Sequence, residues 1–244
     1  MPEYANKIIE QAKEAKKNDV TAIVNFIKYR EIKNILHFTH IKNLTSILDF
    51  GLQSRININL SDIKPIFSDI SRVEGIPQGI FCSLAYPNIW MLEQKISSEG
   101  DVFAVLEIGE NTLLDRAFAA FPGNSATSII RTDATQNPHA YVGVSGLKNM
   151  FLNDELRRKE QVPRSVPTDL QSEIIFFNSL EKERIRRVHF SKFIPDNLQY
   201  IFEILSNDYK HLKIDLNCNH GYFQRQTPNR VHDGRKFNLG WKIN

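Results

Sequence analysis

One acidic residue stands at a position where it could do chemistry. Glu173 opens the apolar run EIIFF (residues 173–177) directly after a polar stretch that contains two prolines. Charged residues are rarely buried without a partner or a role, so a carboxyl group at the start of a buried strand is a candidate catalytic acid. The alternative is a solvated strand end, which is the commoner outcome for such a residue.

Other common catalytic and binding patterns find little support. His37 and His40 have the spacing of a helical metal-binding pair, but their segment looks like a strand and further ligands are missing. No metal site is therefore expected, and the two histidines are read as buried or cofactor-contacting. The chain has no Walker loop and no Gly-x-Gly-x-x-Gly after a strand, so ATP and Rossmann-type cofactors gain no support. Neither Cys82 nor Cys218 stands in a cysteine–histidine pattern that would suggest a nucleophile.

The helices and strands that must position these residues follow one another in no regular order. Apolar periodicity predicts helices over residues 3–17, 20–29, 41–50, 88–95 and 196–205, and strands over 35–39, 80–84, 101–108, 173–177 and 185–190. Gly51 stands where a helix cap belongs. Residues 53–75 and 155–170 read as polar loops. Since the order shows no βαβ rhythm, the sequence predicts an α+β fold.

Composition limits the setting of the protein. The 244 residues fit one domain with appendages, and 41% hydrophobic residues suffice for a core. Two cysteines without a framework favour a reducing compartment, and the charged N-terminal stretch lacks the apolar core of a signal peptide. No apolar run reaches the ~20 residues of a membrane span, so we expect a cytoplasmic protein without a membrane partner.

The charge is uneven along the chain. The net charge is +3, and residues 211–244 hold six Lys or Arg against two Asp. A basic end of this kind can contact phosphates, although a solvated tail is the reading that charge alone favours.

The segment ILHFTHIKNLTSILDFGLQSR (residues 35–55) has distinctive residues at His37, Thr39, His40, Asn43, Leu44, Gly51 and Leu52. It resembles the start of the DarT family of toxins that ADP-ribosylate DNA, and later segments match that family in the same order and at workable spacings. Arg72 and then GIPQGIFCSLAYPNIWML match the next family block. FAVLEI and AFAAFPGNSATS follow, DLQSEIIFF puts Glu173 on the family's catalytic glutamate, and HGYF resembles the aromatic finish. The resemblance covers roughly residues 35–223.

The chain departs from the commoner family pattern at one strand and in the parts outside residues 35–223, and one family position is ambiguous. The strand that usually reads Phe-Tyr-Phe is IFCSLAYPN here, and its Ser-x-Ala-Tyr-Pro-Asn ending is closer to the guanine-modifying branch than to the thymine-modifying branch. In the FPGNSA turn, either Asn124 or Ser125 holds the family's polar position.

The resemblance implies a fold and a division of the chain. The expected fold is an α+β, ADP-ribosyltransferase-like split β-sheet, with NAD⁺ in a cleft between two small sheets and with peripheral helices. Residues 1–31 would form an N-terminal helical extension, 32–223 the transferase domain and 224–244 a basic C-terminal tail.

The resemblance also implies roles for residues. Glu173 would act as general base and contact the reacting ribose, and Arg72 would hold the NAD⁺ phosphates or polarise the acceptor base. The cofactor-binding residues implied in this way are His37, Thr39, His40, Asn43, Gly51, Leu52, Arg72 and Met91, with Trp90 beside them. For Met91 and Trp90 an ordinary core position is an equal alternative.

Partners follow from the same comparison. The loop before Glu173 would grip single-stranded DNA through Arg157, Arg158, Lys159 and Arg164, a solvated charge run being the alternative. Unpaired bases suit such a reaction because their nitrogens are accessible. As the toxin of a toxin–antitoxin pair, the chain would have a DarG-like macrodomain antitoxin as partner. Two rival functions stay open: an ADP-ribosyltransferase acting on RNA or protein, and a non-catalytic nucleic-acid-binding module.

Overall fold

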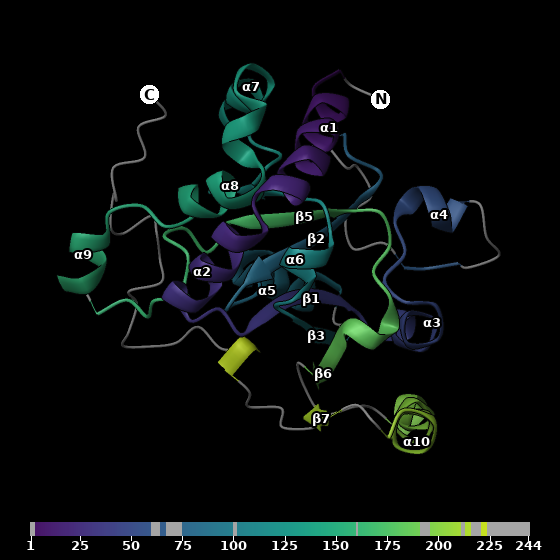
Figure 1. Ribbon diagram of the computed structural model, residues 1–244. Helices are drawn as coiled ribbons and strands as arrows, with labels where there is room; N and C mark the ends of the chain where they lie inside the picture. The colour runs from purple at the N-terminus through teal and green to yellow at the C-terminus, as the bar shows by residue number, and fades with distance from the viewer. Residues whose placement is uncertain are drawn as a thin grey trace.

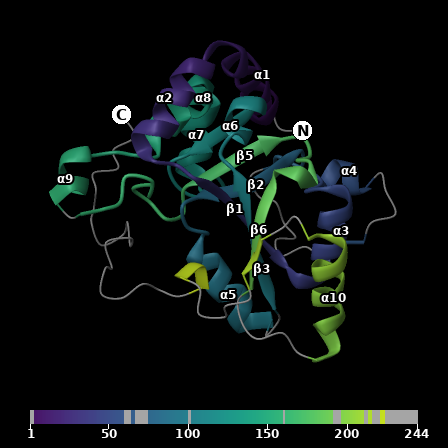
Figure 2. The ribbon, with the colours of Figure 1, turned by 60° about the horizontal axis from the view of Figure 1, so that its bottom comes forward.

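A single seven-stranded sheet organises the protein (Figures 1 and 2). The computed structural model describes residues 3–59, 64–66, 75–99, 102–159, 161–190, 196–210, 213–215 and 221–223. The strands lie in the order β4-β5-β2-β1-β3-β6-β7, and all neighbours are antiparallel except β6 and β7. Their bounds are β1 Asn34–His40, β2 Gly79–Leu84, β3 Phe103–Gly109, β4 Phe118–Phe121, β5 Glu173–Phe177, β6 Ile185–Phe190 and β7 Lys213–Asp215.

The sheet is split in its middle. Strand β2 pairs with β5 from Gly79 to Cys82, but it pairs with β1 only through its last two residues, which face Ile35 and Leu36. Two half-sheets, β4-β5-β2 and β1-β3-β6-β7, are thus joined at one corner. Beyond Leu36 the facing segments of β1 and β2 both line a cavity. The split places an opening inside the sheet rather than on its face.

Helices cover the two half-sheets unequally. Four of them gather over β4 and β5 in both views: α1 (Glu3–Asn18), α2 (Val20–Arg30), α7 (Ser128–Gln136) and α8 (Gly143–Asn149). Beside the second half-sheet lie α3 (Leu44–Phe50), α5 (Ile89–Glu99) and α10 (Gln199–Asp208), and α4 (Arg55–Asn59) lies next to α3, level with β2 and β5. The remaining elements are α6 (Thr112–Asp115), α9 (Asp154–Lys159), and the short 3₁₀ turns η1 (Ile41–Asn43), η2 (Pro138–Tyr141), η3 (Lys182–Arg184), η4 (Asp196–Leu198) and η5 (Gly221–Phe223).

Apolar sequence runs explain the strands that form the centre. All seven residues of β3 and all five of β5 are buried, as expected for strands covered on both faces. A separate cluster joins the N-terminal helix to β4, with Tyr4, Ile8 and Ala12 packing near Ala119 and Phe121. Residues 3–30 therefore pack directly on the first half-sheet.

One glycine sets the path of the chain at the cavity. Gly51 ends α3 with φ +79°, and a Cβ atom there would collide with the backbone carbonyl of Leu180. Only glycine adopts this conformation at little cost, and it lets Leu52 form a bridge with Leu180. The bridge ties the end of α3 to the segment after β5.

The α+β class and the split sheet predicted from the sequence are confirmed. Local details differ. The loop predicted for 53–75 contains α4, the loop predicted for 155–170 begins with α9, and β4 was missed because FAAF is too short to show alternation. None of the helices in the described part of the chain is long and apolar enough to cross a membrane. The tail proposed for 224–244 lies outside the described residues.

Candidate active site

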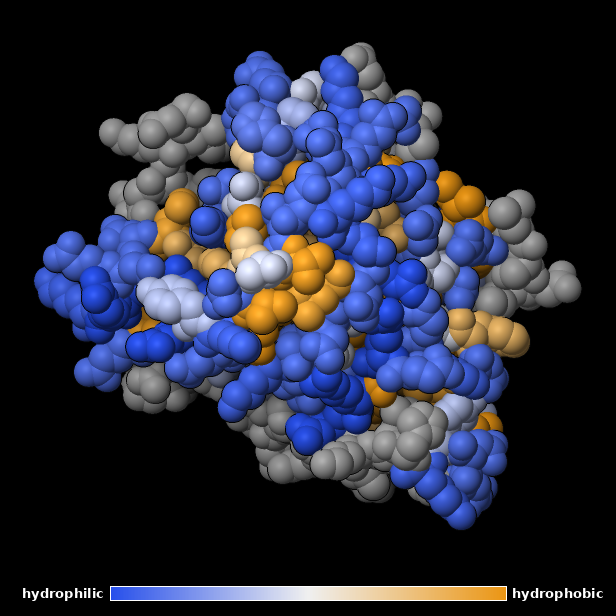
Figure 3. All heavy atoms as spheres, in the orientation of Figure 1, coloured by the Kyte–Doolittle hydropathy of each residue, from blue (hydrophilic) through white to orange (hydrophobic). Residues whose placement is uncertain are grey.

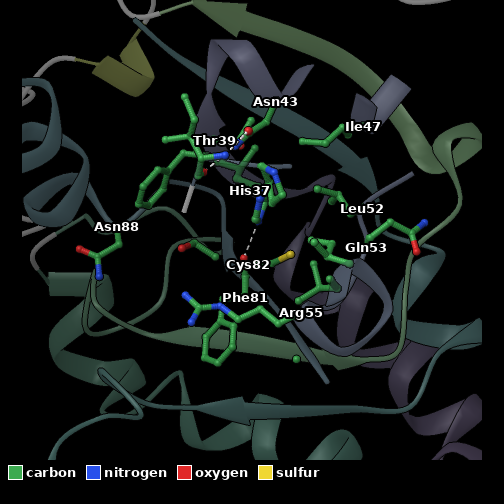
Figure 4. Close-up of a pocket in the computed structure, with 18 of the residues that line it drawn as sticks. His37, Thr39, Asn43, Ile47, Leu52, Gln53, Arg55, Phe81, Cys82 and Asn88 are labelled. Carbon is green, nitrogen blue, oxygen red and sulfur yellow. Dashed lines mark hydrogen bonds between the residues drawn. The ribbon is translucent and has the colours of Figure 1, made fainter. Parts of the chain in front are cut away.

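A cavity of about 800 Å³ opens where the two half-sheets separate (Figure 4). That volume falls in the usual range for pockets that bind small molecules and cofactors. Its walls come from β1, α3, α4 and the segment 64–66 on one side, and from β2, the 124–126 turn and the start of β5 on the other. Seven of the residues predicted to bind cofactor or catalyse meet there: His37, Thr39, Asn43, Gly51, Leu52, Met91 and Glu173.

Glu173 is held by the turn that follows β4. The backbone N–H and the hydroxyl of Ser125 both donate to Glu173 Oε2, at 3.0 and 2.6 Å. Glu173 is 9% exposed and Ser125 1%, so the contact is shielded from bulk water. Hydrogen bonds to a carboxylate are roughly twice as strong as neutral ones and fix its orientation. The sequence left open which residue of this turn would be the polar one, and Ser125 is the residue that contacts the glutamate.

His37 spans the split between the half-sheets. Its Nδ1 lies 2.8 Å from the carbonyl oxygen of Phe81, as the dashed line in Figure 4 marks. A carbonyl oxygen only accepts, so Nδ1 carries the hydrogen and, in the neutral ring, Nε2 is the acceptor atom. The side chain thus replaces the backbone pairing that ends at Leu36.

Thr39 and Asn43 form a small network at the same wall. The amide Nδ2 of Asn43 donates to Thr39 Oγ1 at 3.1 Å and to the Ile66 carbonyl at 2.8 Å. The Ile66 N–H in turn donates to Asn43 Oδ1 at 2.8 Å. Asn43 therefore fastens segment 64–66 against the cavity, a function that its position in the sequence did not indicate.

Two predicted site residues do not join this cluster. His40 is 1% exposed but lies away from the cavity lining: its Nδ1 accepts from the Lys42 N–H, and its ring packs edge-on against Phe103. Strand alternation places its side chain on the face of β1 opposite that of His37 and Thr39, and it caps η1. Arg72 lies outside the described residues.

The charged residues of the lining are cations, apart from Glu173. Lys42, Arg55 and Lys64 line the cavity, and Glu173 is the single carboxylate among the lining residues that the structure describes. The sequence analysis missed all three cations, because nothing in an isolated Lys or Arg distinguishes a cavity wall from solvent.

Cys82 also lines the cavity and is buried. Burial raises the pKa of its thiol well above the ordinary value. The thiol therefore stays protonated at neutral pH, which makes it a poor nucleophile. This agrees with the absence of a nucleophile pattern in the sequence.

The predicted DNA-gripping loop requires a correction. Arg157 is 3% exposed: its guanidinium donates to the carbonyls of Pro163 and Val166 and lies over the Phe151 ring. Burial, the first cause, and the charge of Arg30 lower its pKa to about 10. Its role is to hold its own loop together, and it is not available to a DNA backbone.

The other cations of that loop are exposed but distant from the cavity lining. Arg158 donates to the Asp154 carbonyl, and Arg164 faces Glu31 at 3.5 Å. Lys159 ends α9. None of the four predicted cations lines the cavity, and α9 lies on the opposite side of the molecule from α3 and α4 (Figures 1 and 2).

A resident metal finds no ligand set in the described ranges. No group of three or more His, Cys, Asp or Glu side chains comes together there in a way that could hold an ion.

Comparison with known proteins places the fold. No family model matches the sequence, and no curated protein does either. Among solved structures, Thermosipho africanus DarTG in complex with ADP-ribose matches with a TM-score of 0.50 and 13% identity over 78% of this chain. The chain has the DarT-type ADP-ribosyltransferase fold. It spans about half (51%) of the DarTG chain.

Further DarT structures match with lower scores. Thermus sp. 2.9 DarT in complex with NAD⁺ is 15% identical, with a TM-score of 0.44 over 78% of this chain and 97% of that one. The same protein in complex with ADP-ribosylated single-stranded DNA is 13% identical, with a TM-score of 0.48 over 78% and 96%. The DarT fold is the one that the sequence segments at 35–55 and 169–177 led us to expect.

Proposed function

We propose that this chain is an NAD⁺-dependent ADP-ribosyltransferase that modifies a base in single-stranded DNA. One observation supports this above the others: Glu173, held by two hydrogen bonds from Ser125, shares a cavity of about 800 Å³ with His37 and Thr39 at the split of a DarT-type fold. T. africanus DarTG binds ADP-ribose, and a cavity of this size suits a dinucleotide.

The proposed reaction has one bond breaking and one forming. The glycosidic bond between nicotinamide and ribose C1′ breaks, and nicotinamide leaves with the electron pair. A nitrogen of the acceptor base bonds to C1′, and its proton passes to the Glu173 carboxylate. The carboxylate also favours the positive charge that develops on the ribose, and holding both reactants in one cavity makes their encounter intramolecular.

Five further residues that line the cavity hold the cofactor in this proposal. His37, Thr39, Gly51, Leu52 and Met91 line the NAD⁺ site. Asn43 lines the same site. Arg72, beyond the described residues, keeps its predicted role at the phosphates or the acceptor base.

The finer parts of the proposal rest on sequence. The Ser-x-Ala-Tyr-Pro-Asn stretch that begins at the end of β2 favours guanine over thymine as the acceptor. In a toxin–antitoxin pair, a DarG-like macrodomain protein would remove the modification, and the reaction would take place in the cytoplasm.

The test follows NAD⁺ and three acceptors at once. The purified protein is incubated with NAD⁺ and single-stranded DNA, RNA or a protein mixture, and nicotinamide release and ADP-ribose transfer are measured. We expect transfer to single-stranded DNA, none to duplex DNA, and loss of transfer in Glu173→Gln but not in Glu183→Gln, whose side chain is exposed and outside the cavity. Transfer to RNA or protein alone would move the proposal to those acceptors, and an active Glu173→Gln variant would refute the mechanism.

A further inference from the structure

Exposed apolar side chains gather on one side of the cavity. Of the seven large hydrophobic residues exposed in the described part of the chain, three (Phe50, Ile56 and Ile66) come from the segment 50–66. Phe50 and Ile66 line the cavity, and Phe50 is 61% exposed. Figure 3 shows hydrophobic side chains at the surface over α3 and α4. A single exposed apolar residue is ordinary, whereas several converging at an opening mark a binding surface.

Cations from the same stretch of the chain also line the cavity. Arg55 comes from α4 and Lys64 from segment 64–66. We call Phe50, Arg55, Lys64 and Ile66 the lip. An aromatic ring beside guanidinium and ammonium groups suits single-stranded nucleic acid, because bases stack on the ring and phosphates pair with the cations.

Hydrogen bonds and a β-bridge hold the backbone of the lip in place. Asn43 forms two hydrogen bonds of 2.8 Å with the backbone of Ile66, one through each end of its amide. Gly51 and the Leu52–Leu180 bridge fix the chain directly after Phe50. A platform fixed in this way loses little freedom when a ligand binds, so more of the contact free energy appears as affinity.

The lip and the glutamate lie on different half-sheets. Phe50 ends the helix that follows β1, whereas Glu173 opens β5 of the other half-sheet. When one base of a DNA strand reaches Glu173, the adjacent nucleotides would therefore lie over the cavity wall that carries the lip. The cations that sequence had assigned to this task do not line the cavity, and Arg157 among them is buried.

We propose that the lip binds the acceptor strand: Phe50 stacks with an unpaired base adjacent to the modified one, and Arg55 and Lys64 contact the phosphates between them. This inference rests on the proposed function and names the surface through which its DNA substrate is held.

The test separates DNA binding from NAD⁺ use. Affinity for a fluorescent single-stranded oligonucleotide and NAD⁺ hydrolysis without DNA are measured for wild type, Phe50→Ala and Phe50→Trp. Phe50→Ala should weaken DNA binding by about 5- to 150-fold, equivalent to about 1–3 kcal/mol, while the kcat and KM of NAD⁺ hydrolysis stay unchanged. Phe50→Trp should retain binding. Ile129→Ala is the matched control, because Ile129 is 67% exposed on α7 and outside the cavity.

The cations give a second readout. Replacing Arg55 and Lys64 together by glutamine should make the plot of log affinity against log salt concentration less steep by about 1.4. Each lost phosphate contact with a single strand accounts for about 0.7 of this change. Unchanged affinity in Phe50→Ala would overturn the inference. A raised KM for NAD⁺ in the absence of DNA would overturn it too, because Phe50 would then contact the cofactor. A wild-type protein that neither consumes NAD⁺ nor modifies DNA would instead refute the proposed function, whereas an active wild type with an indifferent lip would refute the lip alone.

Discussion

Replacing Ser125 by alanine removes one of the two hydrogen bonds that Ser125 donates to Glu173. The lost bond is the 2.6 Å contact from the hydroxyl, whereas the backbone N–H still donates at 3.0 Å. Because Ser125 is 1% exposed, water is poorly placed to replace the hydroxyl. We expect the carboxylate to remain in the cavity with a less defined orientation.

The size of the effect follows from the kind of hydrogen bond. A bond between a hydroxyl and a charged group contributes about 1.5–3 kcal/mol. If the whole of that contribution serves the transition state, kcat falls by about 10- to 150-fold, at about 1.36 kcal/mol per factor of ten. KM for NAD⁺ should change little, because the hydroxyl acts on the glutamate and not on the bound cofactor.

The assay compares two neighbouring serines. ADP-ribose transfer and thermal unfolding are measured for wild type, Ser125→Ala, Ser125→Thr and Ser172→Ala. Ser172 is equally buried and precedes Glu173, but its hydroxyl donates to the Pro122 carbonyl and not to the carboxylate. Ser125→Thr, which retains a hydroxyl, should recover part of the rate. Equal rate losses in Ser125→Ala and Ser172→Ala, in step with equal losses of stability, would refute a role for Ser125 in positioning Glu173.

Three further predictions concern other contacts. Burial raises the pKa of Glu107, but hydrogen bonds, first among them that from His189, lower it by more, so the net shift is downward from the ordinary value of 4.5. A carboxylate with a lowered pKa stabilises the fold above its ordinary pKa, and this stabilisation is lost as the pH falls through the pKa of the folded state. Glu107→Gln should therefore lower the free energy of unfolding at pH 7 by about 3 kcal/mol and flatten its fall below pH 4.5 in urea titrations, and an unchanged pH profile would contradict this. Arg157→Ala should lower the free energy of unfolding by about 2–4 kcal/mol in the same titration without a specific loss of DNA affinity, and the reverse pattern would restore its predicted DNA contact. Asn43→Ala should speed hydrogen exchange in a peptide containing Ile66 by about fivefold, since a lost hydrogen bond is worth about 1 kcal/mol, and unchanged exchange would mean that Asn43 does not hold that segment.

Most of the central fold could be predicted from the sequence. The apolar runs around Ile35, Ile80 and Ile174 are long enough to identify β1, β2 and β5, and Gly51 marks the end of α3. These features depend on local composition and backbone conformation, so a single sequence shows them.

The missing parts depend on long-range contacts. FAAF is recognisable as a strand only beside β5, where Phe121 faces Glu173. Arg157 belongs to a charged run that reads as solvated, and its burial requires Phe151 and the Val166 carbonyl to fold around it. A run of charges on its own does not indicate which member will be enclosed.

The same limit applies within the site. Sequence placed His37, Thr39 and Glu173 together through a family resemblance, and the structure brings them to one cavity. The contact of Ser125 with Glu173 and that of Asn43 with Ile66 join residues whose separation along the chain carries no periodic signal. Side-chain hydrogen bonds of this kind become visible only in three dimensions.

The central claim is tested most directly by the mass of a single-stranded DNA oligonucleotide after incubation with the protein and NAD⁺. Our account predicts a gain of one ADP-ribose per modified site, absent with Glu173→Gln and with duplex DNA, and fragmentation should place it on a base, guanine before thymine. An oligonucleotide of unchanged mass, in a reaction that still contains NAD⁺ as the donor, would contradict the account.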